Sequence, residues 1–368
     1  MFGRLKIYWK NFDWIILAAV FLLVAFGLLE IYSVALGQGS VSLLNFQKQL
    51  FFAAIGFILL FVFAFWDSSV LKNLSPYLYW IGAFLLLALF VFGRNIRGHQ
   101  GWFTLGGFNL QPVEFVKVIL ILFLARYFAN LATKVKVARH FIFSAFSAGL
   151  LIVFVLMQPD LGSALILGAV WLIMVIAAGF KKKYFIIVGL VLVVIATSGW
   201  FFLLKDYQKE RIFTFLNPTA NSLESGYNIS QAMIAVGSGG LTGQGVGFGS
   251  QSQLKFLPEA HTDFIFSVIA EELGFLGVIL ILSFYFIFFF RCFRVMKKIN
   301  NDFGLYFLIG ASGLIFIQMF INIGMNMGIM PVVGLPLPFV SYGGSSLISL
   351  LLLVGMIENI IIKSRISY

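Results

Sequence analysis

Long apolar runs separated by short polar segments dominate the pattern of the sequence. A helix needs roughly 20 residues to cross a hydrocarbon layer about 30 Å thick, and ten runs come near that length. The ten runs cover residues 14–36, 47–66, 76–93, 112–132, 139–157, 160–180, 184–204, 263–290, 303–328 and 341–362. The pattern therefore predicts an all-α integral membrane protein with about ten transmembrane helices, forming one polytopic membrane domain over residues 1–368.

The composition supports a membrane protein and narrows the possible partners. Of 368 residues, 61% are hydrophobic and only 11% are charged, and the mean hydropathy is +1.02, far above the usual composition of soluble domains. The Lys and Arg residues stand in short clusters between apolar runs, as membrane anchors do, so the net charge of +11 predicts no nucleic-acid binding. The single cysteine, Cys292, excludes an internal disulfide bond and a cysteine-based metal cluster.

Basic residues set the expected orientation, because cytoplasmic loops are enriched in Lys and Arg. With the N-terminus inside, the inner segments collect sixteen of these residues and the outer segments seven, and both termini are cytoplasmic. The first apolar run is longer than a signal-peptide core and lacks a small-residue cleavage pattern, so we expect it to stay as a helix. The largest outer loop, residues 205–262, lies between the seventh and eighth helices.

This outer loop contains a glycine-rich run, GSGGLTGQGVGFG, from Gly237 to Gly249. The run has no Gly-Lys-Ser/Thr ending and no preceding strand, so a nucleotide-binding phosphate loop is not expected. Glycine allows a positive φ and close approach of the backbone, which favours a tight reentrant loop. An alternative is that the exposed N–H groups help to hold an anionic head group.

Carboxylates are concentrated where this loop meets the eighth apolar run. The segment LKFLPEAHTDFIFSVIAEELG contains Glu259, Asp263, Glu271 and Glu272. A charge at bilayer depth costs about 2.5–3.5 kcal/mol on insertion scales, so such residues are usually paired or functional. Asp263, Ser267 and Glu271 recur every four residues, which predicts one polar stripe on a helix. We expect Thr262 to be the N-cap of that helix.

Two further sets of polar residues lie inside apolar runs. Glu114 and Lys117 stand three residues apart on one helix face, where they can neutralise each other or contact a substrate. In the ninth run the amides Gln318, Asn322 and Asn326 recur every four residues. Such amides usually hold helices together, and beside an acidic stripe they can also line a shared cavity.

Metal ligands are sparse in the sequence. His261 has no second histidine or cysteine at the spacing of a zinc site, so we expect no such metal centre. A hard divalent cation such as Mg²⁺ or Mn²⁺, held by Asp or Glu oxygens, stays open.

Several segments resemble the motifs of the SEDS family, whose members include RodA and FtsW. The matching segments are LQPVEFVK, MQPDLGSA, ERIFTFLNP, GYNISQAMIAVGSGGLTGQGVG, LKFLPEAHTDFIFSVIAEELGFLG, INIGM and PLPFVSYGGSS. They cover most of the chain in the order of the family, and DYQKERIFTFLNP with VGSGG is more similar to the elongation members, of the RodA type, than to the division members. The resemblance implies a SEDS-type bundle of ten helices. It also implies that the chain polymerises lipid II on the outer face of the bacterial cytoplasmic membrane.

The resemblance further implies site residues and partners. The Asp of the HTDFIF motif, the essential catalytic residue of the family, falls on Asp263. The candidates for binding substrate are Glu114, Lys117, Asp160, Arg211, His261 and Ser341. The implied partners are a class B penicillin-binding transpeptidase, lipid II with the nascent glycan strand, and other membrane proteins of the elongation complex.

The reaction we expect transfers a glycan chain from its undecaprenyl-pyrophosphate carrier to the 4-hydroxyl group of an incoming lipid II. Asp263 would take the proton of that hydroxyl, and the leaving pyrophosphate needs positive charge from Arg211, Lys205, Lys255 or a divalent cation. The main alternative is a lipid-carrier flippase, but no internal repeat is visible and the ionisable residues gather in the outer half. A purely structural scaffold would leave Asp263 unexplained.

Overall fold

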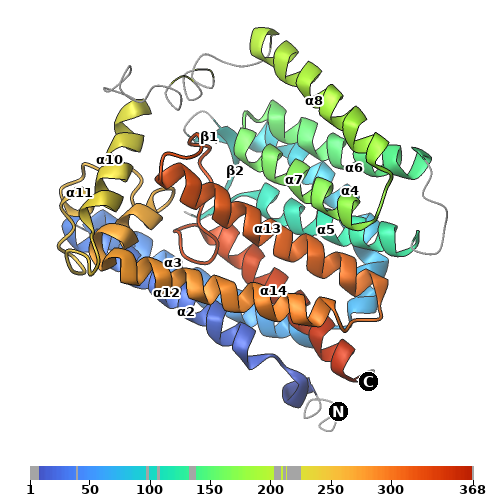
Figure 1. The fold of residues 1–368 in the computed structure, drawn as a ribbon, viewed down its shortest axis with the longest axis horizontal. Helices are drawn as coiled ribbons and strands as arrows, with labels where there is room; N and C mark the ends of the chain where they lie inside the picture. Colours follow the sequence, from blue (N-terminus) through green and yellow to red (C-terminus); the bar gives the residue numbers. More distant parts are fainter. Residues whose placement is uncertain are drawn as a thin grey trace.

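The computed structural model shows a bundle of long helices (Figure 1). The structure describes residues 8–38, 40–96, 99–105, 108–131, 138–202 and 225–366, and the single residues 209 and 213. In these residues ten long helices occupy the ten predicted ranges, so the predicted helices are confirmed. They are α2 (Trp14–Gln38), α3 (Ser40–Phe65), α4 (Ser68–Phe92), α5 (Pro112–Ala129), α6 (Ala138–Met157), α7 (Leu161–Ala177), α8 (Lys182–Phe202), α12 (Ile265–Met296), α13 (Asp302–Asn326) and α14 (Gly344–Ile366).

Seven of the described helices are long and apolar enough by themselves to cross a membrane: α2, α3, α4, α6, α12, α13 and α14. Of the others, α7 has only 17 residues, and α5 carries Glu114, Lys117 and Arg126 within 18 residues. Short or partly charged helices can cross a bilayer when they are packed inside a bundle. The chain is therefore a multi-pass, all-α membrane protein.

The third helix begins earlier than its apolar run suggested. α4 starts at Ser68 instead of near residue 76, because the Asp67 side chain caps it by accepting the Ser69 N–H at 3.0 Å. Pro76 lies inside the helix without ending it. A hydropathy pattern misses such a start, since the first turns of α4 are polar.

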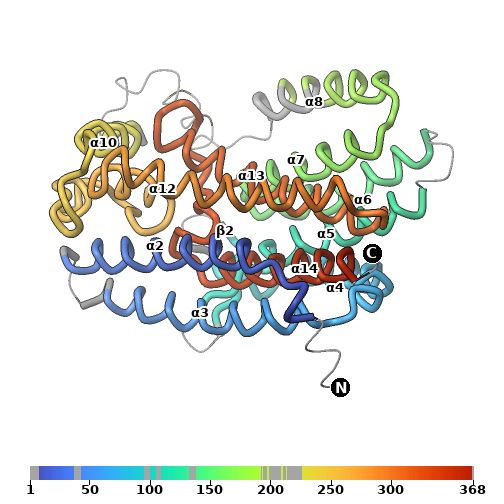
Figure 2. Tube along the Cα trace, turned by 60° about the horizontal axis from the view of Figure 1, so that its bottom comes forward, coloured from blue at the N-terminus to red at the C-terminus, as the bar shows by residue number. Residues whose placement is uncertain are grey.

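The core of the bundle is centred on α14, which packs against α3, α4, α5 and α13. Of its membrane-span residues 89% are buried, compared with 28% in α3, so α14 is enclosed by the other helices. Figure 2 shows α2 beside α3 along one side and α8 at the opposite edge. The start of α8 is held to α6 by stacking of Tyr184 on Phe141, with ring centroids 5.0 Å apart.

The first and last described segments meet at one end of the bundle, which we call the terminal end (Figure 1). There the Asp13 carboxylate accepts hydrogen bonds from Arg291 and Arg365, at the ends of α12 and α14. The Asp13 N–H donates to Glu358 Oε2 at 3.0 Å. These contacts tie the start of the chain to its last helix.

The opposite end, which we call the loop end, carries the short helices α10 (Ser225–Ser238) and α11 (Ser250–Gln253). It also carries a small antiparallel sheet of β1 (Arg94–Ile96), β2 (His99–Leu105) and β3 (Phe108–Leu110), in the order β1-β2-β3. The sheet packs on α4, α5 and α14, and so covers the bundle at this end.

Candidate active site

The candidate site lies at the loop end, where a turn of residues 254–264 leads into α12. Asp263 is half-buried in this turn, just before the helix begins. The N-cap is Phe264, which makes no side-chain cap, so the prediction that Thr262 caps the helix is wrong. The Thr262 hydroxyl instead donates to the Glu259 carbonyl oxygen at 3.2 Å, because the chain folds back before the helix starts.

The loop that precedes α14 holds the backbone just before the candidate carboxylate. Tyr342 N donates to the His261 carbonyl oxygen at 2.8 Å, and the Ser341 hydroxyl donates to the Thr262 carbonyl oxygen at 2.6 Å. The rings of His261 and Tyr342 meet nearly edge to face, 5.5 Å apart. The Ser341 hydroxyl also accepts a backbone N–H of its own loop. It is therefore engaged within the protein, and its contact with substrate stays a prediction.

Two amides of α13 hold the next carbonyl group, that of Asp263. The Nδ2 atoms of Asn322 and Asn326 each lie 3.0 Å from its oxygen. Asn322 also donates to the Leu335 carbonyl oxygen at 2.7 Å, and the Ser267 hydroxyl donates to Asn326 Oδ1 at 2.7 Å. These two amides therefore hold segments of the bundle together, as one of the two interpretations of the amide row predicted.

The proline-rich loop, residues 328–341, lies beside the Asp263 carboxylate. A Cβ atom on Gly334 would stand 3.5 Å from Asp263 Oδ2, so the carboxylate lies against the backbone of this loop. Gly334 has a φ of +69°, a conformation that glycine adopts without strain. The same loop packs on the start of α7, where a Cβ atom on Gly162 would come within 2.7 Å of the Val333 carbonyl oxygen. The loop thus connects α7, α12 and α13 around the site.

The other predicted substrate residues lie on neighbouring helix starts. Asp160 caps α7, and its side chain accepts from Ser163 N at 2.9 Å. Near the start of α5, Lys117 Nζ lies 2.7 Å from Glu114 Oε1, with 1% and 4% of the two side chains exposed. The predicted ion pair is therefore confirmed. Arg211 lies outside the described residues.

Six buried side chains of the described residues keep a polar atom without a hydrogen-bond partner, and two of them lie on α5 and α13. Glu114 Oε2 and both polar side-chain atoms of Gln318 have no hydrogen-bond partner among the described residues. Gly310 of α13 lies against Ile121 of α5, and the two helices run in opposite directions. Gln318 therefore comes near the depth of Glu114. Such atoms are available to a polar ligand or an ordered water.

Glu271 and Glu272 are fully buried, and both serve as structural carboxylates. Glu271 accepts the N–H groups of Gln251, at 2.7 Å, and Ser252, at 3.2 Å, in the short helix α11. Glu272 has four donors: Ser33 Oγ at 2.5 Å, Gly247 N at 3.1 Å, Gln253 Nε2 at 3.1 Å and Ser252 Oγ at 3.3 Å. The predicted stripe is therefore split, because Glu271 binds α11 whereas Ser267 binds α13.

The glycine-rich run wraps around a break in α12 at Gly274, where φ is +65° and ψ is −162°. The break frees backbone groups of α12, and the run supplies their partners. Gln244 N and Gly245 N donate to the Glu271 and Glu272 carbonyl oxygens at 2.9 Å, and Phe275 N and Leu276 N donate to the Gly240 and Leu241 oxygens. A Cβ atom on Gly243 would lie 2.1 Å from the Glu272 carbonyl oxygen, so the predicted tight backbone is confirmed. The anionic group that Gly247 N binds is the chain's own Glu272 carboxylate.

One residue that positions the loop was missed from the sequence. Gln49 of α3 is buried, donates to the Ser341 carbonyl oxygen at 3.1 Å and accepts from Gly343 N at 3.1 Å. It therefore fixes the segment that in turn holds the carbonyl groups of His261 and Thr262. The available signal was a glutamine inside an apolar run, which is typical of an amide that joins helices.

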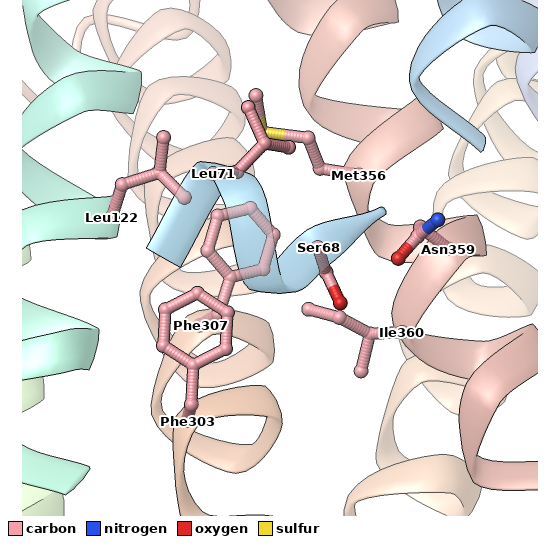
Figure 3. A pocket seen from close by; sticks show the side chains of 8 residues that line it. All are labelled: Ser68, Leu71, Leu122, Phe303, Phe307, Met356, Asn359 and Ile360. Carbon is pink, nitrogen blue, oxygen red and sulfur yellow. The ribbon is translucent and has the colours of Figure 1, made fainter. Parts of the chain in front are cut away.

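Metal ligands do not gather at the site in the part of the chain that the structure describes. There, no three or more His, Cys, Asp and Glu side chains form a group that could hold a metal ion. The divalent cation stays a prediction, and no step below depends on it. A small pocket between α4, α5, α13 and α14 lies towards the terminal end (Figure 3), and its lining is mainly apolar, with Leu71, Phe303 and Ile360 among its residues.

Comparisons with known sequences agree with this arrangement. A family described as cell cycle protein, named for FtsW, RodA and stage V sporulation protein E, has a model that matches residues 13–366. Peptidoglycan glycosyltransferase MrdB of Escherichia coli K12 is 37% identical over 317 residues, which are 83% of each chain. Stage V sporulation protein E of Bacillus subtilis is 35% identical over 370 residues, covering 96% of this chain and 98% of that protein.

Solved structures share the fold. A chain of a peptidoglycan synthase complex, described as coordinating polymerization and crosslinking, has a TM-score of 0.81 and 30% identity. The rod shape determining protein RodA of Thermus thermophilus has a TM-score of 0.72 and 27% identity. Each comparison covers 97% of this chain and 98% of the solved chain, so the likeness extends over both ends of the bundle.

Proposed function

The chain belongs to the cell cycle protein family of FtsW, RodA and stage V sporulation protein E and is a peptidoglycan glycosyltransferase, and we propose that it polymerises lipid II at its loop end. The observation that carries the proposal is the fixed, half-buried Asp263, at the junction of a surface turn and a membrane helix. A lipid-linked substrate presents its sugar at this level, because its hydrocarbon carrier stays in the bilayer.

In the proposed reaction, the 4-hydroxyl oxygen of the incoming lipid II attacks the anomeric carbon of the growing chain. A bond forms between this oxygen and the anomeric carbon, and the bond from that carbon to the undecaprenyl pyrophosphate breaks. Asp263 accepts the hydroxyl proton as general base, because an alcohol is a poor nucleophile until its proton is removed. The pyrophosphate leaves with the electron pair of the broken bond.

The leaving pyrophosphate needs positive charge nearby. Lys255 is exposed in the same turn as Asp263, and its φ of +64° shows a backbone conformation that non-glycine residues rarely adopt. We assign the stabilising charge to Lys255 together with Arg211 and Lys205. We assign a contact with the sugar to His261, whose ring lies beside that of Tyr342.

The Glu114–Lys117 pair is assigned to substrate binding, with Asp160 of α7 on the neighbouring helix. Glu114 uses one oxygen for Lys117 and has no described partner for the other, which supports a contact with a polar substrate group. Exchanging the two residues, as Glu114→Lys with Lys117→Glu, keeps the ion pair but reverses its direction. The exchange should restore folding relative to either single change and leave polymerisation impaired. Full recovery of activity would reduce the pair to a structural contact.

We place the protein in the bacterial cytoplasmic membrane, with both termini in the cytoplasm and the loop end outside. The contact between Asp13 and Arg365, which puts the first and last described segments at one end, supports this orientation. So do the basic residues of the segments assigned to that side. The similarity to a chain of a synthase complex supports a class B penicillin-binding transpeptidase as partner. By the RodA-type resemblance, the complex is the one that elongates the cell.

The decisive experiment uses purified protein in membrane vesicles with labelled lipid II, with and without the transpeptidase. We expect glycan polymer to form, and more of it with the partner. Movement of lipid II across the membrane without polymer, in both preparations, would favour a flippase instead.

A further inference from the structure

We propose that Asn322 and Asn326 of α13 are positioning residues that set where the Asp263 carboxylate stands relative to the reacting hydroxyl. This inference rests on the proposed role of Asp263 as general base. Both asparagines are fully buried, and each donates a hydrogen bond to the backbone carbonyl oxygen of Asp263. They would therefore act through Asp263.

Two donors on α13 hold the peptide group that joins Asp263 to Phe264. Both Nδ2 atoms lie 3.0 Å from the Asp263 carbonyl oxygen, so the two lone-pair positions of that oxygen are filled by the same helix. Asn326 Nδ2 also donates to the Asn322 carbonyl oxygen at 2.8 Å, which holds the second amide to the first. With its carbonyl oxygen held this way, the peptide group between Asp263 and Phe264 can rotate little.

Each asparagine also holds a second segment that bears on Asp263. Asn326 Oδ1 accepts from the Ser267 hydroxyl at 2.7 Å and from Ser267 N at 3.2 Å. The Asn326 side chain therefore binds both Asp263, just before α12, and Ser267, in its first turn. Asn322 donates to the Leu335 carbonyl oxygen at 2.7 Å, next to Gly334, the residue against which the Asp263 carboxylate lies. One residue thus sets the distance between the carboxylate and the loop beside it.

An amide suits this role chemically. It offers two N–H donors to neutral carbonyl oxygens and adds no charge next to the base, whereas a Lys or Arg there would form an ion pair with the carboxylate and lower its basicity. Precise placement matters for catalysis, since a displacement of about 1 Å can cost on the order of a hundredfold in rate. A contact that only held α12 to α13 would change stability without this selective effect on rate.

The test measures lipid II polymerisation and thermal unfolding of purified Asn326→Ala, Asn322→Ala and Asn326→Asp. The last change keeps an acceptor for Ser267 but replaces the donor to the Asp263 oxygen with a carboxylate oxygen and adds a charge. Asn326→Ala removes the same donor without adding a charge, so the two variants separate the hydrogen bond from the charge. We expect kcat to fall by about 10–100-fold, with KM changed by less than about threefold, in every variant that folds. Ser312→Ala is the matched control, because Ser312 lies on the same helix, well before the two asparagines, and donates to the Leu308 oxygen at 2.7 Å. It should keep kcat.

A double-mutant cycle separates positioning from simple stabilisation. If Asn326 acts through Asp263, adding Asn326→Ala to Asp263→Asn should leave the residual rate of Asp263→Asn unchanged. An equal fold-loss in both backgrounds would overturn the inference and leave a structural contact. Wild-type kcat in Asn322→Ala and Asn326→Asp would overturn it as well. Near wild-type activity of Asp263→Asn alone would instead refute the proposed base, so the two failures are distinguishable.

Discussion

Two acidic regions lie near the start of α12, Asp263 on one side and Glu271 with Glu272 on the other, and their hydrogen bonds differ. At Glu271 and Glu272, the hydrogen-bond donors of the protein go to the carboxylate oxygens, and both side chains are fully buried. Around Asp263, donors from α13 and from the loop before α14 hold backbone carbonyl groups of the turn, and the Asp263 side chain is half-buried at the surface. The first arrangement immobilises the charge, whereas the second fixes the backbone that carries it.

The difference separates a structural carboxylate from a candidate base. A buried charge is costly unless hydrogen bonds replace its water, and the four donors on Glu272 do this for one side chain. The same donors occupy the lone pairs that a substrate proton would need. Glu271 is enclosed by α11 in the same manner. Asp263 is half-buried at the surface turn, so it is more accessible to a substrate than either of these two buried carboxylates.

The largest effect should come from Asp263→Asn. The amide keeps the size of the side chain but cannot accept the proton, so polymerisation should fall by at least about a hundredfold, the lower range for losing a general base. The unfolding temperature should stay near that of the wild type, because the backbone contacts remain. Activity of the wild type should rise with pH as the carboxylate ionises. A near wild-type rate for purified Asp263→Asn would transfer the role of base to another group.

Glu272→Gln should give a smaller effect of the opposite kind. The substitution removes the charge and turns an N–H₂ group towards donors such as Ser33 and Gly247. Hydrogen bonds to charged groups contribute about 1.5–3 kcal/mol, so the free energy of unfolding should fall by that order. The rate per folded molecule should change little, which an active-site titration combined with thermal unfolding can measure. If Glu272→Gln kept its free energy of unfolding but lost polymerisation activity, Glu272 would not be a purely structural carboxylate.

Gly274→Ala tests the break in α12 around which the glycine-rich run packs. The backbone conformation at Gly274 is essentially restricted to glycine, and a Cβ atom would lie 2.3 Å from Gly243 N. The strain should cost about 1–3 kcal/mol in the free energy of unfolding. Gly237→Ala is the control, since nothing lies within 4 Å of its added Cβ atom and the residue is helical. Equal unfolding temperatures for the two variants would show that the break in α12 tolerates a side chain.

The smallest effect is expected at a third carboxylate, Asp67, at the terminal end. The Lys363 ammonium group, followed by the Ser69 N–H, holds the pKa of Asp67 well below its ordinary value. A lowered folded-state pKa contributes stability above the ordinary Asp value of about 3.9, and this contribution is lost as the pH falls. Because both side chains are substantially exposed, Asp67→Asn should cost less than about 1 kcal/mol at pH 7. Unfolding measured at pH 7 and pH 3 should show a smaller difference at pH 3, because the contribution declines below the ordinary pKa and is lost only as the pH falls through the folded-state pKa. A cost at pH 7 several times larger than about 1 kcal/mol would show that solvent does not screen this ion pair.

The helices could be predicted from the sequence because the bilayer imposes their length and leaves no other way to satisfy the backbone. The Glu114–Lys117 pair was predictable for a similar reason, since its spacing along one helix fixes the distance. The small sheet at the loop end was not predictable, because β1 and β3 have three residues each and show no useful alternation. Asp263 stood out through its position and its motif, and its function as a base stays a prediction.

The roles of the other acidic residues depend on partners far away in the sequence. Ser33 lies 239 residues from Glu272, and Asn322 lies 59 residues from Asp263. No local pattern specifies which of two carboxylates will meet such a donor. The turn before α12 was misread for the same reason. A Thr before an apolar run predicts a cap, but the Ser341 hydroxyl and the Tyr342 N–H hold the backbone in another conformation.

The central position of α14 has a consequence for the order in which the protein can assemble. Ribosomes add residues from the N-terminus at about 5–20 per second, and α14 is the last helix in the described chain. The 352 residues that separate Asp13 from Arg365 correspond to roughly 20–70 s of synthesis at that speed. During this interval α2 to α13 are added one after another while α14 is still missing, and the Asp13 carboxylate meets Arg291 before Arg365. The final packing of α3, α4, α5 and α13 therefore takes place only after α14 has been inserted.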